Sequence, residues 1–204
     1  MNTENKDEEM FLADVTRHEM NIIRDDGVNR HIRFKRPGSY CMHFDLITWP
    51  GYLCYTGDMG TYVFQRLDDM FEFFRTDRRG QPLAINPSYW GEKLQAVDSG
   101  DGFKQYSHEK FCQLINELVE QHIKDDELTP DQARELKAEV ESEVLGCEEY
   151  ENAAHIAARD FEHEGFEFSD FWEHDLKDYS YRFMWCCRAL AWGINKYDET
   201  KAVS

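Results

Sequence analysis

The chain has 204 residues, which is long enough for one domain with a substantial hydrophobic core. Hydrophobic residues make up 41% of it and aromatic residues 14%, a composition that excludes a disordered protein. The formal charge of −18 excludes direct binding to nucleic acid or to an anionic membrane surface.

Two strands are expected before residue 40. Residues 1–9 are predicted to be disordered, and residues 10–18 to form a short helix or an extended lead-in. Residues 19–24 and 30–36 flank an Asp-Asp-Gly turn signal, which predicts that they pair as a β-hairpin.

The most concentrated apolar and aromatic material lies in residues 40–64. Residues 41–47 alternate between two faces, which is the period of a β-strand. A Pro-Gly pair and a Gly-Asp-Met-Gly segment then interrupt β-branched and aromatic residues. The pattern predicts an antiparallel meander of three strands.

Helical spacing follows the meander. Residues 67–75 are predicted to form a helix, residues 77–81 a charged loop, and residues 86–94 a short helix that begins at an Asn-Pro pair. The loop signal is clearest at residues 98–102, DSGDG, and it leads into an almost wholly helical second half.

Five helices are expected in that second half. The first runs over residues 107–124 with a serine N-cap, and the second over residues 129–145 with a Thr-Pro start and a glycine after its end. A third is predicted over residues 148–163, and a short fourth begins near residue 169. Residues 179–197 are apolar around most of their circumference, which predicts a core helix buried against the sheet.

These elements predict the α+β class, with an N-terminal antiparallel sheet of about five strands packed by a C-terminal helical layer. We expect a single domain over residues 1–204. Residues 10–102 are its sheet half with short helices, and residues 103–204 are its acidic helical half.

One strand face offers a candidate catalytic group. Cys41, His43 and Asp45 would project from the same side of a strand and could bind a metal or form an acid–base pair. The other interpretation is the polar face of a half-covered sheet. The histidines of the second half, His155 and His163 among them, lack metal-binding spacing, so no metal or cofactor is expected.

The six cysteines include no C-x-x-C pair, and Cys186 and Cys187 are adjacent in a helical pattern where their side chains diverge. A zinc site and a disulfide framework are therefore not expected. The polar N-terminus has no apolar signal region, and no run of about eighteen apolar residues occurs. We therefore expect free thiols, no membrane association and a reducing cytoplasm.

Acidic side chains are concentrated in residues 117–178, which hold 21 Asp and Glu against 5 Lys and Arg. Four of these acids lie at successive i+4 positions of one predicted helix: Asp131, Glu135, Glu139 and Glu143. The apolar seam of that helix lies on roughly the opposite side and consists of Ala133, Leu136, Val140 and Val144. Carboxylates about 6 Å apart in a line resemble the charges along one nucleic-acid strand. Further acids extend this surface at both ends: Asp125, Asp126, Glu127, Glu148, Glu149 and Glu151. The other interpretation is an acidic helix that is simply soluble.

Two blocks, FDLITWPGYLCYTGDMGTYVF and DLKDYSYRFMWCCRALAWGINKY, resemble a widespread family of small phage and prophage accessory proteins. The resemblance spans residues 16–197 and carries no catalytic residues. It implies a protein made in the cytoplasm of an infected bacterium, where accessory genes often encode inhibitors of host defence. The acidic helices lie outside the matching blocks.

Charge and resemblance together predict a non-enzymatic inhibitor that occupies the nucleic-acid groove of a basic host defence complex, such as a CRISPR effector or a restriction enzyme. One alternative is an enzyme that acts through Cys41, His43 and Asp45. Another is a protein–protein adaptor that uses exposed aromatic residues such as Trp49 or Trp172. The sequence leaves a homodimer open.

Overall fold

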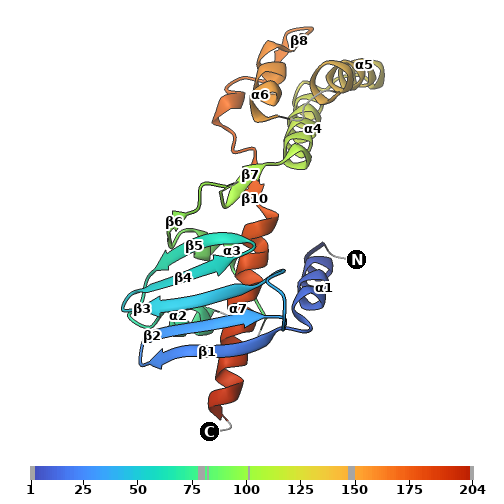
Figure 1. Ribbon diagram of the computed structural model, residues 1–204. Helices are drawn as coiled ribbons and strands as arrows, with labels where there is room; N and C mark the ends of the chain where they lie inside the picture. Colours follow the sequence, from blue (N-terminus) through green and yellow to red (C-terminus); the bar gives the residue numbers. More distant parts are fainter. Residues whose placement is uncertain (1–2, 78–80, 82, 101, 147–149, 203–204) are drawn as a thin grey trace. The chain divides into compact units, whose positions relative to one another are not determined.

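The chain divides into two units, each with its own hydrophobic core. The computed structural model describes residues 3–77, 81, 83–100, 102–146 and 150–202 (Figure 1). The first unit, called the sheet unit below, consists of Met1–Phe103 and Tyr179–Ser204. The second, the helical unit, consists of Lys104–Asp178. The first half and the C-terminal segment thus share one core, while the segment between them has another.

The sheet unit is built on six antiparallel strands that lie side by side in chain order. They are β1 (Glu19–Asp26), β2 (Asn29–Lys35), β3 (Phe44–Trp49), β4 (Tyr52–Gly57), β5 (Gly60–Gln65) and β6 (Leu94–Val97). The structure is 49% helix and 25% strand, so the α+β class is confirmed, as are the predicted hairpin and meander.

The sixth strand is a correction to the sequence interpretation, which placed Leu94 on a short helix. The helix α3 is shorter than expected and spans only Pro87–Gly91. Its N-cap is the expected one, because Asn86 Oδ1 accepts a hydrogen bond from the Tyr89 amide. Leu94 lies opposite Phe64 of β5. A four-residue strand has too little periodicity of its own to be predicted, and its pairing with β5 decides its structure.

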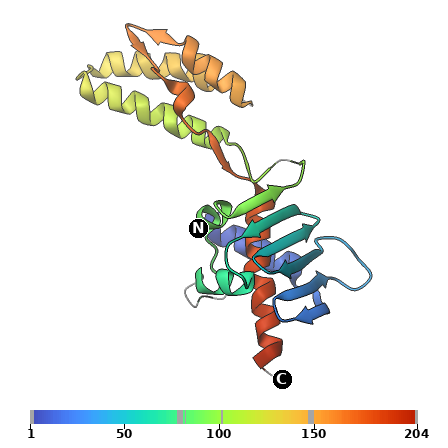
Figure 2. The same ribbon diagram turned by 90° about the vertical axis from the view of Figure 1, so that its left-hand side faces the viewer.

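One helix, α7 (Tyr181–Ala202), runs along a single face of the sheet. Figure 1 shows it crossing behind the strands, and Figure 2, turned by 90°, shows it beside them. Its Gly193 faces the side chains of Phe34 and Leu46, and Trp185 packs edge-to-face on Phe44 with ring centroids 5.7 Å apart. The helix α2 (Met70–Asp77) contributes four further buried apolar side chains to this core. The predicted core helix is therefore confirmed, and it is the part of the expected helical layer that packs on the sheet.

The N-terminal segment is helical, and the expected disorder of residues 1–9 is wrong from Thr3 onward, because α1 spans Thr3–Val15. Phe11 is 2% exposed and packs against Trp185. The Trp185 indole N–H donates to Asp14 Oδ2 over 3.0 Å. These partners lie about 170 residues away in the sequence, so no local pattern could reveal them.

The helical unit contains α4 (His108–Asp125), α5 (Pro130–Val140) and α6 (Glu151–Asp160). A π-helical turn, η1 (Glu141–Leu145), continues α5. Both predicted caps are present: Ser107 Oγ accepts from the Lys110 amide, and Thr129 forms a capping box with Gln132. The core of this unit is apolar and partly aromatic, and its buried members include Phe111, Ile115, Leu136, Val140, Val144, Phe161 and Phe171.

The last part of the helical unit is less helical than expected. The third helix ends at Asp160 rather than at residue 163, and a short hairpin of β8 (Glu162–His163) and β9 (Phe166–Glu167) follows. The expected fourth helix is a single 3₁₀ turn, η2 (Phe171–Glu173). The strands β7 (Lys104–Tyr106) and β10 (Lys177–Tyr179) pair with each other. The helix ends because Phe161, its C-cap, has an extended backbone with φ of −74° and ψ of 130°. Gly165, with φ of +85°, occupies the turn between β8 and β9.

The two units meet between Phe103 and Lys104, one residue from the expected division between residues 102 and 103. The helix α7, which the sequence analysis counted in the helical half, shares the core of the sheet unit. That both units form one domain stays a prediction.

The cysteines differ widely in burial, and this predicts their reactivity. The five in the described part of the chain are free, while Cys147 lies outside it. Burial raises the pKa of Cys186 and Cys187 far above the ordinary thiol value, whereas Cys41 is exposed. We expect a disulfide-exchange reagent to modify Cys41 rapidly in the native protein, to leave Cys186 and Cys187 unmodified, and to count six thiols in denaturant. Four or fewer thiols in fresh denatured protein would contradict the prediction.

Candidate interaction surface

The two units differ sharply in charge. The helical unit contains 22 acidic and 7 basic side chains, a net of −15, and the sheet unit contains 19 and 16, a net of −3. Because the 75 residues of the helical unit carry most of the charge, their surface produces most of the electrostatic field of the protein. The candidate site is therefore sought there.

The acidic row on α5 is exposed as predicted. Asp131, Glu135 and Glu139 face solvent, and Leu136 and Val140 are each 2% exposed on the opposite side. A rise of about 1.5 Å per residue spaces these three carboxylates roughly 6 Å apart along the helix axis.

Glu143, the fourth member of the predicted row, is also exposed. It lies in η1, whose hydrogen bonds close i→i+5 turns, and not in α5 itself. The row therefore consists of three carboxylates on α5 and a fourth on the π-helical turn that continues it.

Two basic residues neutralise part of the α5 surface. Arg134 Nη2 lies 2.9 Å from Asp131 Oδ1, and Lys137 forms an ion pair with Glu120 of α4. Glu135 and Glu139 form no ion pair within the residues that the structure describes. They are therefore the members of the row that are most available to a basic partner.

The acids at the end of α4 lie in the connection that leads into α5. Asp125 accepts a hydrogen bond from Gln121 over 2.7 Å, and Asp126 lies 3.5 Å from His122 Nδ1. Glu127 has a left-handed φ of +51°, which makes the chain turn toward α5. Because α5 begins at Pro130, this exposed acidic corner lies at the end of α5 that carries Asp131.

The other predicted extension is weaker. Glu148 and Glu149 lie outside the described residues. Glu151 begins α6, is partly buried and lies 3.3 Å from Lys177 Nζ. Its charge is therefore partly balanced within the unit.

The proposed strand face of Cys41, His43 and Asp45 is not formed. Met42 has a left-handed φ of +58°, which interrupts the extended backbone, and β3 begins only at Phe44. Cys41 is in a turn, and His43 Nδ1 lies 2.7 Å from the Tyr40 carbonyl oxygen. Only Asp45 is on the strand, so the shared face on which the catalytic alternative depended is wrong.

Asp45 instead belongs to an ion-pair cluster on the sheet. Arg33 donates two hydrogen bonds of 2.8 Å to its carboxylate, and His31 Nε2 lies 2.7 Å from Oδ2. Burial acts to raise the pKa of Asp45, but the hydrogen bonds from Arg33 and His31 outweigh it and hold that pKa below its ordinary value. A carboxylate held in this way is a structural anion.

The histidines of the helical unit are dispersed. His155 is on α6, His163 is on β8, and His174 follows η2. The described part of the chain contains no group of three or more His, Cys, Asp or Glu side chains placed to bind a metal ion.

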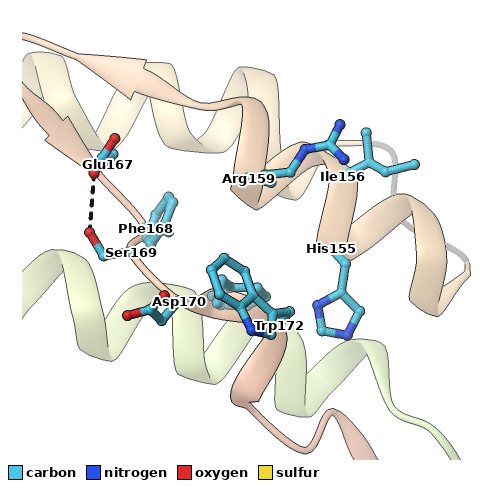
Figure 3. Close-up of a pocket in the computed structure, with 9 residues that line it drawn as sticks. His155, Ile156, Arg159, Glu167, Phe168, Ser169, Asp170 and Trp172 are labelled. Atoms are coloured by element: carbon cyan, nitrogen blue, oxygen red, sulfur yellow. Dashed lines mark hydrogen bonds between the residues drawn. The ribbon is translucent and has the colours of Figure 1, made fainter.

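A pocket of about 460 Å³ is a feature that the sequence interpretation missed. One wall is provided by α6 and the other by the segment from Glu167 to Trp172 (Figure 3). Trp172 is 65% exposed and lies between the two sets of residues in Figure 3. The sequence indicated Trp172 only as a candidate exposed aromatic, because the packing of α6 against η2 is what creates the pocket.

Fold and surface together define an α+β protein of two units, one of which is a small helical unit with a strongly acidic surface. None of the described helices has the length and apolar character required to span a membrane. Comparison with known proteins gives no family model, no curated protein and no solved structure that matches the chain. The resemblance to phage accessory proteins therefore stays a prediction.

Proposed function

We propose that the protein is a phage-encoded, non-enzymatic inhibitor that binds a basic, nucleic-acid-binding host defence complex in the bacterial cytoplasm, such as a CRISPR effector or a restriction enzyme. The observation that carries the proposal is the exposure on α5 of carboxylates that form no ion pair within the described residues, in a unit of net charge −15. Glu135 and Glu139 mark that surface.

The protein would bind the partner through the same electrostatic attraction that the partner uses to bind nucleic acid. A basic groove attracts anions over long range, and salt screens this attraction with a Debye length of about 10 Å at 0.1 M. An acidic helix that enters the groove excludes the phosphate backbone because both need the same lysines and arginines. The protein itself should not bind DNA or RNA.

The test is a triple variant, Glu135→Gln, Glu139→Gln and Glu143→Gln. The basic partner is first captured from the bacterial host and identified by mass spectrometry, and displacement of labelled DNA from it is then measured. We expect the triple variant to displace DNA about tenfold less effectively than the parent at low salt, with a smaller difference as salt increases.

The matched control removes three charges from the sheet unit through Glu19→Gln, Glu72→Gln and Glu92→Gln, all at exposed positions. It should displace DNA as well as the parent does. The α5 variant should keep its stability, because neutralising neighbours at i and i+4 removes a repulsion of a few tenths of a kcal/mol. Equal displacement by parent and α5 variant at every salt concentration would refute the proposed surface.

A further inference from the structure

The pocket beside α6 presents one large aromatic side chain on a firmly anchored segment. Phe171 is 1% exposed and packs against Phe111, Phe168 and His155 with ring centroids 5.7 to 6.0 Å apart. Because its neighbour is held in the core, Trp172 is directed outward from a defined position. Exposed tryptophans on rigid supports are typical of interface residues that contribute most of the binding energy.

The charges around Trp172 favour a cation. Asp170 and Glu167 line the pocket and are exposed, and the Asp170 side chain makes no cap hydrogen bond to η2. Arg159, which also lines the pocket, donates two hydrogen bonds to Asp160 over 2.7 and 3.1 Å, so its charge is compensated. Glu167 Oε1 accepts a hydrogen bond from Ser169 Oγ over 3.2 Å, and within the described residues neither Glu167 nor Asp170 forms an ion pair. The lining therefore combines an exposed aromatic side chain with two carboxylates that keep their negative charge.

We propose that this pocket binds an arginine side chain of the basic partner, with the guanidinium stacked on Trp172 and paired with Asp170 or Glu167. This inference deepens the proposed function and rests on it. A guanidinium is planar and weakly hydrated and stacks on aromatic rings, whereas a lysine ammonium keeps its water and fits such a site less well.

Other occupants fit the pocket less well. A nucleobase could stack on Trp172, but its phosphates would meet a unit of net charge −15. A second copy of the chain would bring the same negative charge to the contact. Charge complementarity therefore favours the basic protein partner.

The experiment compares two labelled probes, an arginine octapeptide and a lysine octapeptide, by fluorescence anisotropy with the full-length chain at 0.05 and 0.15 M salt. We expect the parent to bind the arginine probe about tenfold more tightly than the lysine probe. Trp172→Ala should weaken the binding of the arginine probe about tenfold, which corresponds to about 1.4 kcal/mol. It should weaken the binding of the lysine probe less than twofold. Trp172→Tyr should keep most of the arginine preference.

The matched control is Tyr150→Ala, which removes a 72% exposed aromatic residue of the same unit outside the pocket and should change neither affinity. Circular dichroism verifies that each variant is folded. If Trp172→Ala leaves arginine binding intact, or weakens both probes equally, the inference is wrong. The inference is also wrong if the parent binds single-stranded DNA and Trp172→Ala abolishes that binding. The same holds if the parent forms a dimer in sedimentation and Trp172→Ala abolishes the dimer.

The α5 triple variant separates this inference from the proposed function. Neutral glutamines at positions 135, 139 and 143 should weaken the binding of both peptides to the same extent and leave the arginine preference unchanged. If Trp172→Ala abolishes the arginine preference and the α5 variant binds both peptides as the parent does, the pocket assignment is supported and the acidic row is refuted. If the α5 variant binds both peptides more weakly and the parent shows no arginine preference, the acidic row is supported and the pocket assignment is refuted.

Discussion

Replacing Gly57 with alanine is expected to destabilise the sheet unit by about 3 kcal/mol. Gly57 ends β4, and a Cβ there would lie 2.8 Å from Phe44 Cα and overlap the His43 carbonyl oxygen. That oxygen already accepts a hydrogen bond from the Asp58 amide, and Phe44 is fully buried, so neither can move without disturbing β3. Overpacking against backbone atoms has costs at the upper end of those measured in cores.

The measurement is urea unfolding followed by tryptophan fluorescence, which reports mainly on the sheet unit because four of the five tryptophans belong to it. The control is Gly51→Ala. A Cβ at Gly51 meets nothing within 4 Å, but its φ of +84° is unfavourable for alanine, so a cost of about 1 kcal/mol is expected. Equal losses for the two variants would show that the close approach at Gly57 has no energetic consequence.

Replacing Asp45 with asparagine is expected to destabilise the same unit by about 2 kcal/mol at neutral pH. The change leaves Arg33 without its carboxylate partner in a site where Asp45 itself is 5% exposed. Loss of one member of a buried pair typically costs about 3 to 5 kcal/mol, and the partial exposure of Arg33 and His31 reduces the effect here.

The effect should depend on pH in a defined direction. The pKa of Asp45 is lower in the folded protein than in the unfolded chain, so its contribution is fully present above the ordinary carboxyl pKa of about 3.9. As pH falls through the lower folded pKa, that contribution is lost, and parent and variant should converge. Urea midpoints at pH 7, 5 and 3 measure this convergence.

Asp26→Asn is the matched control, because Asp26 and Arg24 also form an ion pair but are 76% and 59% exposed. A change below about 0.5 kcal/mol is expected there. If Asp45→Asn is as stable as the parent at pH 7, the cluster with Arg33 has no structural role. Retention of partner binding in folded Asp45→Asn would also separate this carboxylate from function.

Part of the candidate surface could be predicted from local pattern. The capping box at Thr129 and the apolar seam through Leu136 and Val140 determine which side of α5 faces solvent, and so the exposure of Glu135 and Glu139 follows from periodicity alone. The placement of Glu143 in a π-helical turn does not, because η1 has no distinct sequence signal. Nor does the pairing of Lys137 with Glu120, which depends on where α4 lies.

The same distinction applies to the whole chain. Composition, turn residues and the periods of two and 3.6 determined the α+β class, the five successive strands β1–β5, the caps of α4 and α5, and the burial of α7, because each depends on neighbours within one or two turns. The tertiary structure decided the helical state of α1, the pairing of β6, the separation of Cys41 from Asp45 and the pocket at Trp172. In each of these the deciding contact or backbone turn lies outside the local periodicity: α1 packs on α7, β6 pairs with β5, a left-handed Met42 ends the alternation, and α6 faces η2.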